Sequence, residues 1–136
     1  MAGSRPARAD LEWTHDLQFR ATSGTNSLVV DGDSAAGPSP VQLLVIAVAG
    51  CMAADVVDIL RKGRHPLQAL SSSLQAERAP EAPRRLLSVA LHFTVKGGVP
   101  SAAIERAISL SRDKYCSVWH SLRQEISLKT SFDACE

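Results

Sequence analysis

The sequence predicts an α+β fold with antiparallel sheets around a long buried central helix, and three observations support this. Residues 11–30, 67–76 and 87–96 alternate between apolar and polar side chains, a pattern typical of β-strands. Residues 40–62 instead form one long apolar segment with helix start and stop signals at its ends. The resulting order, β-β-(β)-α-β-β-α-α-β, keeps strands in consecutive pairs, so we expect the sheets to be antiparallel.

Length and charge narrow the class of protein. The chain has 136 residues, which fits a single domain of residues 11–136 after a disordered tail of residues 1–10 without the apolar core of a secretory signal. Fifteen Lys and Arg residues against fourteen Asp and Glu residues leave a net charge of +1, which argues against binding to nucleic acid or to an anionic membrane. The most apolar run, residues 43–54, is shorter than the about 20 residues that cross a bilayer. We therefore expect a soluble cytoplasmic protein.

The N-terminal part predicts two or three antiparallel strands. Trp13, Phe19, Leu28 and Val30 are apolar among polar neighbours, and residues 24–26 interrupt the pattern as a turn. Residues 31–33, Asp-Gly-Asp, predict a further turn, and a flexible loop follows.

A helix is predicted from Pro40 to about Lys62. Ser39 suits the N-cap and Pro40 the first helical position, while Lys62 and Gly63 are typical of a C-terminal end. Apart from Gln42, its first turns are apolar on every face, so the helix must be buried. A domain of this size can hardly bury such a helix alone, so we expect a partner subunit to cover it.

The remainder predicts two strands, two helices and a final strand. The strand at residues 87–96 stops at Gly97, and Pro100 opens an amphipathic helix. A turn near residues 114–115 leads into a short helix that begins around Cys116 and carries Trp119. Residues 126–132 alternate again and form the last strand.

Three cysteines, Cys51, Cys116 and Cys135, are too few and too odd in number for a disulfide scaffold. Cys51 lies inside the apolar helix, where a free cysteine usually acts as a small hydrophobe, although Gly50 before it suggests the close approach of another group. Cys116 is expected at a helix N-terminus beside basic residues at 112 and 114, an environment that favours a thiolate. Cys135 lies in the acidic chain end, and we assign it no role.

Two further metal-ligating side chains lie one helical turn from the cysteines. Asp55 lies at i+4 from Cys51, and His120 lies at i+4 from Cys116. The two pairs together would offer a tetrahedral zinc site, but no CxxC or HxxxH spacing supports one. We therefore expect no metal, and zinc is the least favoured alternative.

Two cysteine-containing segments resemble those of the OsmC/Ohr family of osmotically inducible and organic hydroperoxide resistance proteins. The first runs from Gly37 as GPSPVQLL, continues to AGC at Cys51 and ends with DVVDIL from Asp55. The second is KYCSV around Cys116, 65 residues after Cys51. The element order also fits from about residue 11 to residue 132, and the sequence is more similar to the OsmC-like branch than to the classical Ohr enzymes.

This resemblance implies a cofactor-free thiol peroxidase with an OsmC-like fold. Cys51 would be the peroxidatic thiolate that attacks an organic hydroperoxide and becomes a sulfenic acid, and Cys116 would be the resolving thiol that forms a disulfide with it. A dithiol reductant, lipoyl-type in the family, would reopen the disulfide. The family forms an intertwined homodimer with active sites at the subunit interface, in agreement with the partner that the long helix requires.

The resemblance also implies an arginine near Cys51, held by a glutamate. Asp55 and Asp58 would disfavour a Cys51 thiolate if they point at it, so a cation is needed, and Arg20 is the best candidate. Gln42 replaces the family's helix-start glutamate and can hydrogen-bond an arginine without neutralising it.

A substrate pocket beside the thiols would draw on apolar residues from several elements. Phe19, Leu44, Val48 and Trp119 could line it, and His120 could protonate the leaving alkoxide. Two non-catalytic functions stay open as well, a redox sensor and a small-molecule carrier that use the same dimeric pocket. A sensor would form the disulfide but turn over slowly, whereas a carrier would not need Cys51.

Overall fold

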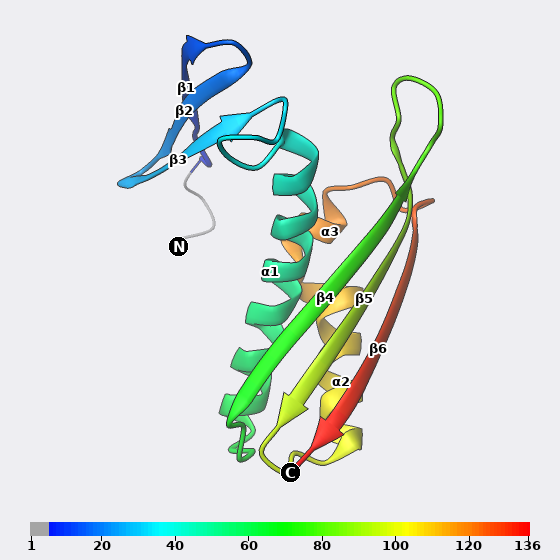
Figure 1. Cartoon of the computed structure of the whole chain (residues 1–136). Coiled ribbons are helices and arrows are strands. Elements are labelled where there is room, and N and C mark those ends of the chain that lie inside the picture. Colours follow the sequence, from blue (N-terminus) through cyan, green and yellow to red (C-terminus); the bar gives the residue numbers. More distant parts are fainter. Residues whose placement is uncertain (1–5) are drawn as a thin grey trace. The chain divides into compact units, whose positions relative to one another are not determined.

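The computed structural model describes residues 6–136 and confirms the α+β class. The chain forms two compact units, one that ends at Leu44 and one from Val45 to Glu136. Each unit contains a three-stranded sheet, with the order β1-β2-β3 in the first and β4-β5-β6 in the second (Figure 1).

The first unit is an antiparallel meander made by the predicted N-terminal strands. β1 spans Asp10–His15, β2 spans Gln18–Ser23 and β3 spans Asn26–Asp31. Trp13 pairs with Phe19, which in turn pairs with Val30 across the sheet. Gly24 has a φ of +61° in the turn before β3, a left-handed conformation that costs glycine little and that closes a tight hairpin.

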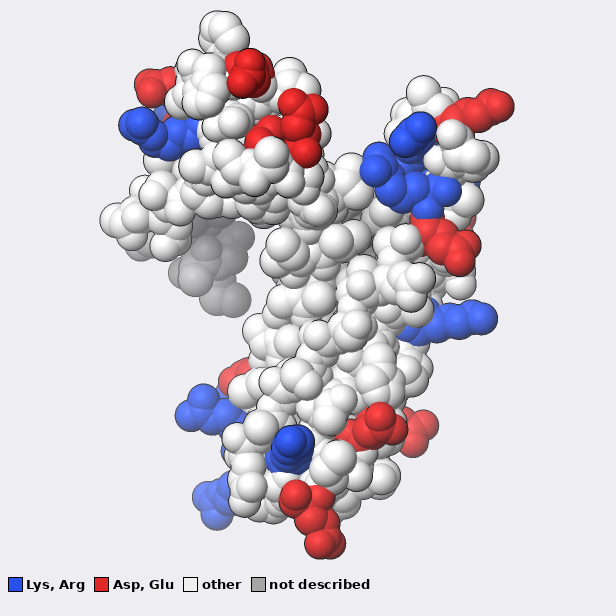
Figure 2. Space-filling model, in the orientation of Figure 1, with Lys and Arg blue, Asp and Glu red and all other residues white. Residues whose placement is uncertain are grey.

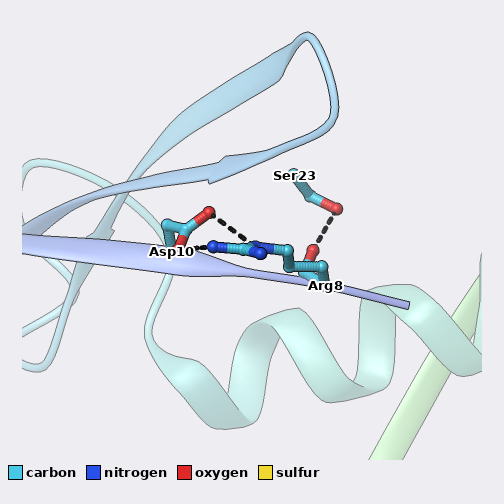
Figure 3. A network of polar contacts seen from close by, with 3 residues as sticks. All are labelled: Arg8, Asp10 and Ser23. Atoms are coloured by element: carbon cyan, nitrogen blue, oxygen red, sulfur yellow. Dashed lines mark hydrogen bonds and ion pairs between the residues drawn. The ribbon is translucent and has the colours of Figure 1, made fainter. Parts of the chain in front are cut away.

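The segment before β1 is tied to the end of β2 by a small polar network (Figure 3). The Ser23 hydroxyl donates to the carbonyl of Arg8 at 2.6 Å, and the Arg8 guanidinium donates to both carboxylate oxygens of Asp10 at 3.3 Å. Of the predicted tail, residues 1–5 lie outside the described part of the chain, and Asp10 is already the first residue of β1.

A buried carboxylate organises the loop that leads into the long helix. Asp31 is 1% exposed and accepts hydrogen bonds from the backbone N–H groups of Asp33, Ala35 and Ala36. These bonds, the strongest from Ala36, lower the pKa of Asp31. The loop expected to be flexible is thus held by one side chain.

The long helix α1 spans Pro40–Lys62, as the sequence predicts. Within one chain it buries a single stripe: Val48, Met52, Val56 and Leu60. Ile46 on another face is 58% exposed, so a single chain does not cover the apolar helix on every side, as expected for a domain of this size. By length and composition alone α1 could also cross a membrane, a property that it shares with the core helices of soluble proteins.

The second sheet contains β4 (Ala69–Arg78), β5 (Leu86–Lys96) and β6 (Ser127–Cys135). β4 and β5 form an antiparallel hairpin, but β5 and β6 pair in parallel, for example Phe93 with Phe132. The prediction of purely antiparallel sheets is therefore wrong here. The reason is the connection: the chain returns from β5 to β6 through a helical crossover, which permits parallel pairing, and not through a short turn.

That crossover consists of three consecutive helical pieces. α2 spans Ser101–Leu110, a π-helical turn η2 spans Ser111–Tyr115, and α3 spans Ser117–His120. α1 and α2 lie along the same side of the second sheet (Figure 1), where the alternate residues Val89, Leu91, Phe93 and Val95 of β5 are buried. Ile104, Ala107 and Ile108 of α2 complete this core.

We expect truncation of the central core residue to destabilise the fold strongly. Phe93 is 0% exposed, so Phe93→Ala should lower the free energy of unfolding by about 3–5 kcal/mol through lost burial and the cavity left behind. Leu87→Ala on the same strand, where Leu87 is 39% exposed, should cost about 1 kcal/mol or less. Urea unfolding at one fixed protein concentration measures both, and equal losses would contradict this description of the core.

Candidate functional site

The structure brings Cys51, Asp55 and Cys116 together in the second unit. The two sulfur atoms and a carboxylate oxygen all lie within 4.8 Å of one another. Cys116 is buried, whereas Cys51 and Asp55 are half-buried. Most of the second unit separates the two cysteines along the chain. They are therefore neighbours because of the tertiary fold and not because they are close in sequence.

Helix α1 positions two of these side chains. Cys51 and Asp55 are four residues apart and therefore point from the same side of the helix on successive turns. They lie next to the buried stripe, since Met52 and Val56 follow them directly and face the core. The helix therefore presents a thiol and a carboxylate at the border between core and surface.

The π-helical turn η2 supplies the rest of the site. Its wider ring is closed by the N–H of Cys116, which donates to the carbonyl of Ser111 at 2.8 Å. The Ser111 side chain is fully buried and donates to Oδ2 of Asp55 at 2.8 Å. One residue thus both shapes the turn before Cys116 and holds the carboxylate beside it. Single π turns inside helices occur frequently at functional sites.

The environment of Cys116 disfavours its thiolate. Cys116 is the N-cap of α3, and its sulfur accepts a hydrogen bond from the N–H of Trp119 at 3.3 Å. Burial nevertheless raises the pKa of Cys116 to about 11; the Trp119 N–H opposes the rise, while Cys51 and the negative charge of Asp55 add to it. The predicted thiolate-favouring helix terminus is therefore wrong, because a four-residue helix offers little dipole against the cost of desolvation.

The basic residues expected beside Cys116, Arg112 and Lys114, contact other side chains. Arg112 donates to the Asp113 carboxylate at 3.0 Å and to the Thr130 hydroxyl at 3.2 Å. The Lys114 ammonium lies 5.3 Å from the centre of the Tyr115 ring. Neither cation is among the causes that set the pKa of Cys116.

A cavity of about 440 Å³ opens beside the thiol cluster. It is lined by Asp55, Asp58, Ile59, Lys62 and Tyr115. The Lys62 ammonium forms an ion pair with the Asp58 carboxylate at 2.9 Å, and this contact raises the pKa of Lys62. Asp55 thus belongs both to the thiol cluster and to a solvent-accessible, charged cavity.

The other residues that the sequence analysis placed near the thiols divide between the two units. Val48 is fully buried in the α1 stripe, Trp119 is buried in α3, and His120 is exposed. Phe19 and Leu44 are half-buried and belong to the first unit. Their part in a pocket stays a prediction.

Arg20 and Gln42 also belong to the first unit. Arg20 is exposed on β2, opposite Glu12 and Val29. The side-chain oxygen of Gln42 accepts hydrogen bonds from the Ser39 N–H and the Ser34 hydroxyl, while the Gln42 N–H donates to the Ser39 hydroxyl. Gln42 therefore acts as the reciprocal partner of the helix N-cap.

Asp55 and Ser111 carry only a weak signal of their place in the site in the sequence, and the environment of Gly50 differs from the one expected. Asp55 was visible at i+4 from Cys51, but the hydrogen bond from Ser111 depends on a π turn that no periodicity reveals. A side chain at Gly50 would meet no atom within 4 Å, so the close approach expected there is not made within the chain. Cys135 is exposed at the end of β6 and takes no part in the cluster.

The site defines the chain as an α+β protein with paired thiols, because a long helix and a crossover bring two free cysteines together. Residues 31–131 match the family described as OsmC-like protein, and the chain belongs to this family. It is 37% identical over 129 residues to protein YhfA of Escherichia coli, covering 93% of this chain and 96% of the relative.

Solved structures agree with this assignment. A hypothetical protein from Aquifex aeolicus is 25% identical and superposes with a TM-score of 0.90, covering 97% of this chain and 98% of that one. An organic hydroperoxide resistance protein OsmC from Legionella pneumophila has the same fold at 14% identity, with a TM-score of 0.72 over 96% and 98% of the two chains. Family membership supports a redox role for the paired thiols.

The raised pKa of Cys116 can be measured directly. In a Cys51→Ser/Cys135→Ser chain, Cys116 should ionise well above the ordinary thiol value of about 8.5, because burial, the largest cause, does not depend on Cys51. Adding Asp55→Asn should lower the value, since it removes a nearby negative charge, whereas Asp58→Asn should leave it unchanged. Thiolate ultraviolet absorbance against pH gives the curve, and ordinary ionisation of Cys116 would show that the sulfur is hydrated.

Proposed function

We propose that this protein is a cysteine-based peroxidase that reduces organic hydroperoxides. The observation that carries the proposal is the meeting of two free thiols, Cys51 and Cys116, within 4.8 Å beside one carboxylate. Two relatives in fold are described as organic hydroperoxide resistance proteins, from Legionella pneumophila and Elizabethkingia anophelis, which supports this substrate class. The proposed setting is the cytoplasm, where both thiols are kept reduced between turnovers.

Cys51 is the proposed peroxidatic residue because it is the more accessible of the two thiols. Its thiolate attacks the distal oxygen of the hydroperoxide, the O–O bond breaks, and the alkoxide leaves as an alcohol after taking a proton. Cys51 is then a sulfenic acid. His120, exposed on α3, is a proposed source of that proton.

Cys116 is the proposed resolving residue. Its sulfur attacks the sulfenic sulfur of Cys51, a disulfide forms, and the hydroxyl leaves as water. The raised pKa of Cys116 means that its proton must be removed during this step. Asp55 lies near both sulfurs and is held by Ser111, so we assign it the transfer of that proton to the leaving hydroxyl.

The cycle closes when an external dithiol reduces the Cys51–Cys116 disulfide. One thiolate of the reductant attacks the disulfide, releases one protein thiol and forms a mixed disulfide. The second thiol of the reductant then attacks this mixed disulfide and displaces the other protein sulfur, so both protein thiols are restored and the reductant becomes a disulfide. A lipoyl-type dithiol is the proposed reductant. No cofactor is needed in this scheme.

The proposed mechanism includes a cation near Cys51, since positive charge favours a reactive thiolate. Arg20 is the proposed cation, because it is an exposed strand arginine without an ion pair among residues 6–136. Gln42, whose side chain already serves the N-cap, is the proposed positioning partner of Arg20. Phe19, Leu44, Val48 and Trp119 are the proposed apolar lining for the organic part of the substrate.

We further propose that the active form is an intertwined homodimer. Ile46, Gly50 and Ala54 recur every four residues on an exposed stripe of α1. Figure 2 shows no charged side chain over the middle of α1 and β4 in the second unit. Leu11 and Trp13 of β1 are 58% and 65% exposed, so apolar surface is also uncovered in the first unit. Such surface is typical of an interface.

A slow redox sensor is the second candidate, favoured by the raised pKa of Cys116. A thiol that is protonated at neutral pH attacks a sulfenic acid slowly unless a base assists it. The rate of disulfide formation separates the two functions, because a peroxidase needs resolution on the time scale of turnover.

The peroxidase proposal predicts distinct outcomes for the three cysteines. Cys51→Ser should abolish consumption of cumene hydroperoxide, because the nucleophile is gone. Cys116→Ser should still consume about one equivalent and leave a sulfenic acid at Cys51 that dimedone traps. Cys135→Ser, in which the exposed thiol at the chain end is removed, should turn over like the unchanged protein.

Intact mass and peptide mapping after addition of hydroperoxide provide the readout. The unchanged protein should lose two hydrogens, mapped to a Cys51–Cys116 disulfide. Hydroperoxide consumption that persists in Cys51→Ser would rule out the peroxidase mechanism. Disulfide formation without turnover in the presence of a dithiol would favour the sensor.

The dimer proposal predicts that a charge on the exposed stripe of α1 weakens association. Ile46→Asp should raise the dimer dissociation constant by about 100-fold or more, since a buried unpaired carboxylate costs several kcal/mol. Ser101→Asp, at an exposed position at the start of α2, should leave it unchanged. Sedimentation measures both, and a folded monomer of the unchanged protein at high dilution would contradict an obligate dimer.

A further inference from the structure

Within residues 6–136, Cys51, Asp55 and Cys116 are the one group of three metal-ligating side chains whose ligand atoms lie within 4.8 Å of one another. They supply two sulfurs and one oxygen from two separate elements, α1 and the start of α3. We propose that this group, when both thiols are reduced, binds a single thiophilic divalent cation of the Zn²⁺ class. The inference concerns the reduced thiols and does not require that the protein turn over hydroperoxide.

The donor chemistry selects the kind of cation. Thiolate sulfur binds Zn²⁺ and the related Cd²⁺ strongly, whereas Mg²⁺ and Ca²⁺ require oxygen ligands. Tetrahedral sites with three protein ligands leave the fourth position to water or another small ligand. The Cys51–Asp55–Cys116 group matches that ligand number.

A second interaction fixes the carboxylate of this group. The buried Ser111 hydroxyl donates to Oδ2 of Asp55 at 2.8 Å, so the carboxylate is oriented before a cation arrives. Hydrogen bonds of this kind to a ligating carboxylate raise metal affinity and are part of most protein metal sites. His120, which the sequence analysis paired with Cys116, is exposed and is not part of the group.

The neighbouring cavity provides an entry path. Asp55 and Asp58 both line the cavity of about 440 Å³, and the Lys62 ammonium is ion-paired with the Asp58 carboxylate at 2.9 Å. Asp55 is thus the carboxylate of this wall that is left to attract a cation from solution. The cation would reach Asp55 first and then the two sulfurs.

Binding is balanced by the release of two protons. The two thiols leave their protons to solvent, and two thiolates with one carboxylate then hold the divalent cation, giving the site a net charge of −1. No electron is transferred in this step. While the cation is bound, the sulfur lone pairs are engaged, so both thiols are protected from oxidation until the metal leaves.

The experiment uses the full chain, reduced and freed of metal, titrated with Cd²⁺ as a spectroscopic probe and with Zn²⁺ in competition. The unchanged protein should bind one Cd²⁺ per chain and develop the ultraviolet charge-transfer band of a Cd²⁺–thiolate bond. Cys51→Ser and Cys116→Ser should each lose at least about half of the band and weaken binding more than about 10-fold. Zn²⁺ should displace Cd²⁺ and abolish the band.

Matched controls separate the site from general thiol and carboxylate effects. Asp55→Asn should weaken Cd²⁺ binding about 10-fold or more, whereas Asp58→Asn, one turn on and in the same cavity, should change it little. Cys135→Ser should bind like the unchanged protein. Binding that survives Cys51→Ser, or that is lost in Cys135→Ser, would overturn the proposal, as would equal affinities in Asp55→Asn and Asp58→Asn.

A parallel measurement keeps this inference distinct from the proposed peroxidase function. Formation of the Cys51–Cys116 disulfide after addition of cumene hydroperoxide is followed with and without one equivalent of Zn²⁺, and Zn²⁺ should slow it about 10-fold or more. A protein that binds Cd²⁺ but forms no disulfide would refute the peroxidase and keep the metal site. A protein that forms the disulfide but shows no Cd²⁺ band would refute the metal site and keep the peroxidase.

Discussion

The packing of one stripe of α1 against the second sheet is the constraint on which the thiol site depends. Met52 and Val56 are fully buried, and this fixes the rotation of the helix about its axis. With that rotation set, Cys51 and Asp55 must emerge at the edge of the core, on the side that meets the crossover. The hydrophobic core therefore sets the direction of the Cys51 and Asp55 side chains, although the core residues are not members of the thiol cluster.

Burial and polarity act in opposite directions at this edge. Cys116 is desolvated, and desolvation raises its pKa, while the Asp55 carboxylate beside it accepts a hydrogen bond from Ser111. In both proposals, disulfide formation and cation binding, the Cys116 thiol gives up its proton as a new bond forms to its sulfur.

The sequence predicts the periodic parts of this fold well and the long-range parts poorly. Helix α1 begins at Pro40 and ends at Lys62, as predicted, because capping residues and apolar spacing are local signals. The parallel pairing of Phe93 with Phe132 was not predictable, since alternation tells which face a residue occupies and not which strand lies beside it. The same limit applies to the site: Cys51 and Cys116 were recognised as motifs, but the role of Ser111 depends on a π turn without a sequence signature.

The crossover between β5 and β6 affects when Cys51 and Cys116 come together as the chain folds. Cys116 lies on the connection between two strands that must pair in parallel, so its place is fixed only when β6 has docked beside β5. Parallel pairing across such a connection closes a long loop and is slow compared with helix formation. In the proposed peroxidase cycle, the Cys51–Cys116 disulfide therefore requires that the last strand has been added.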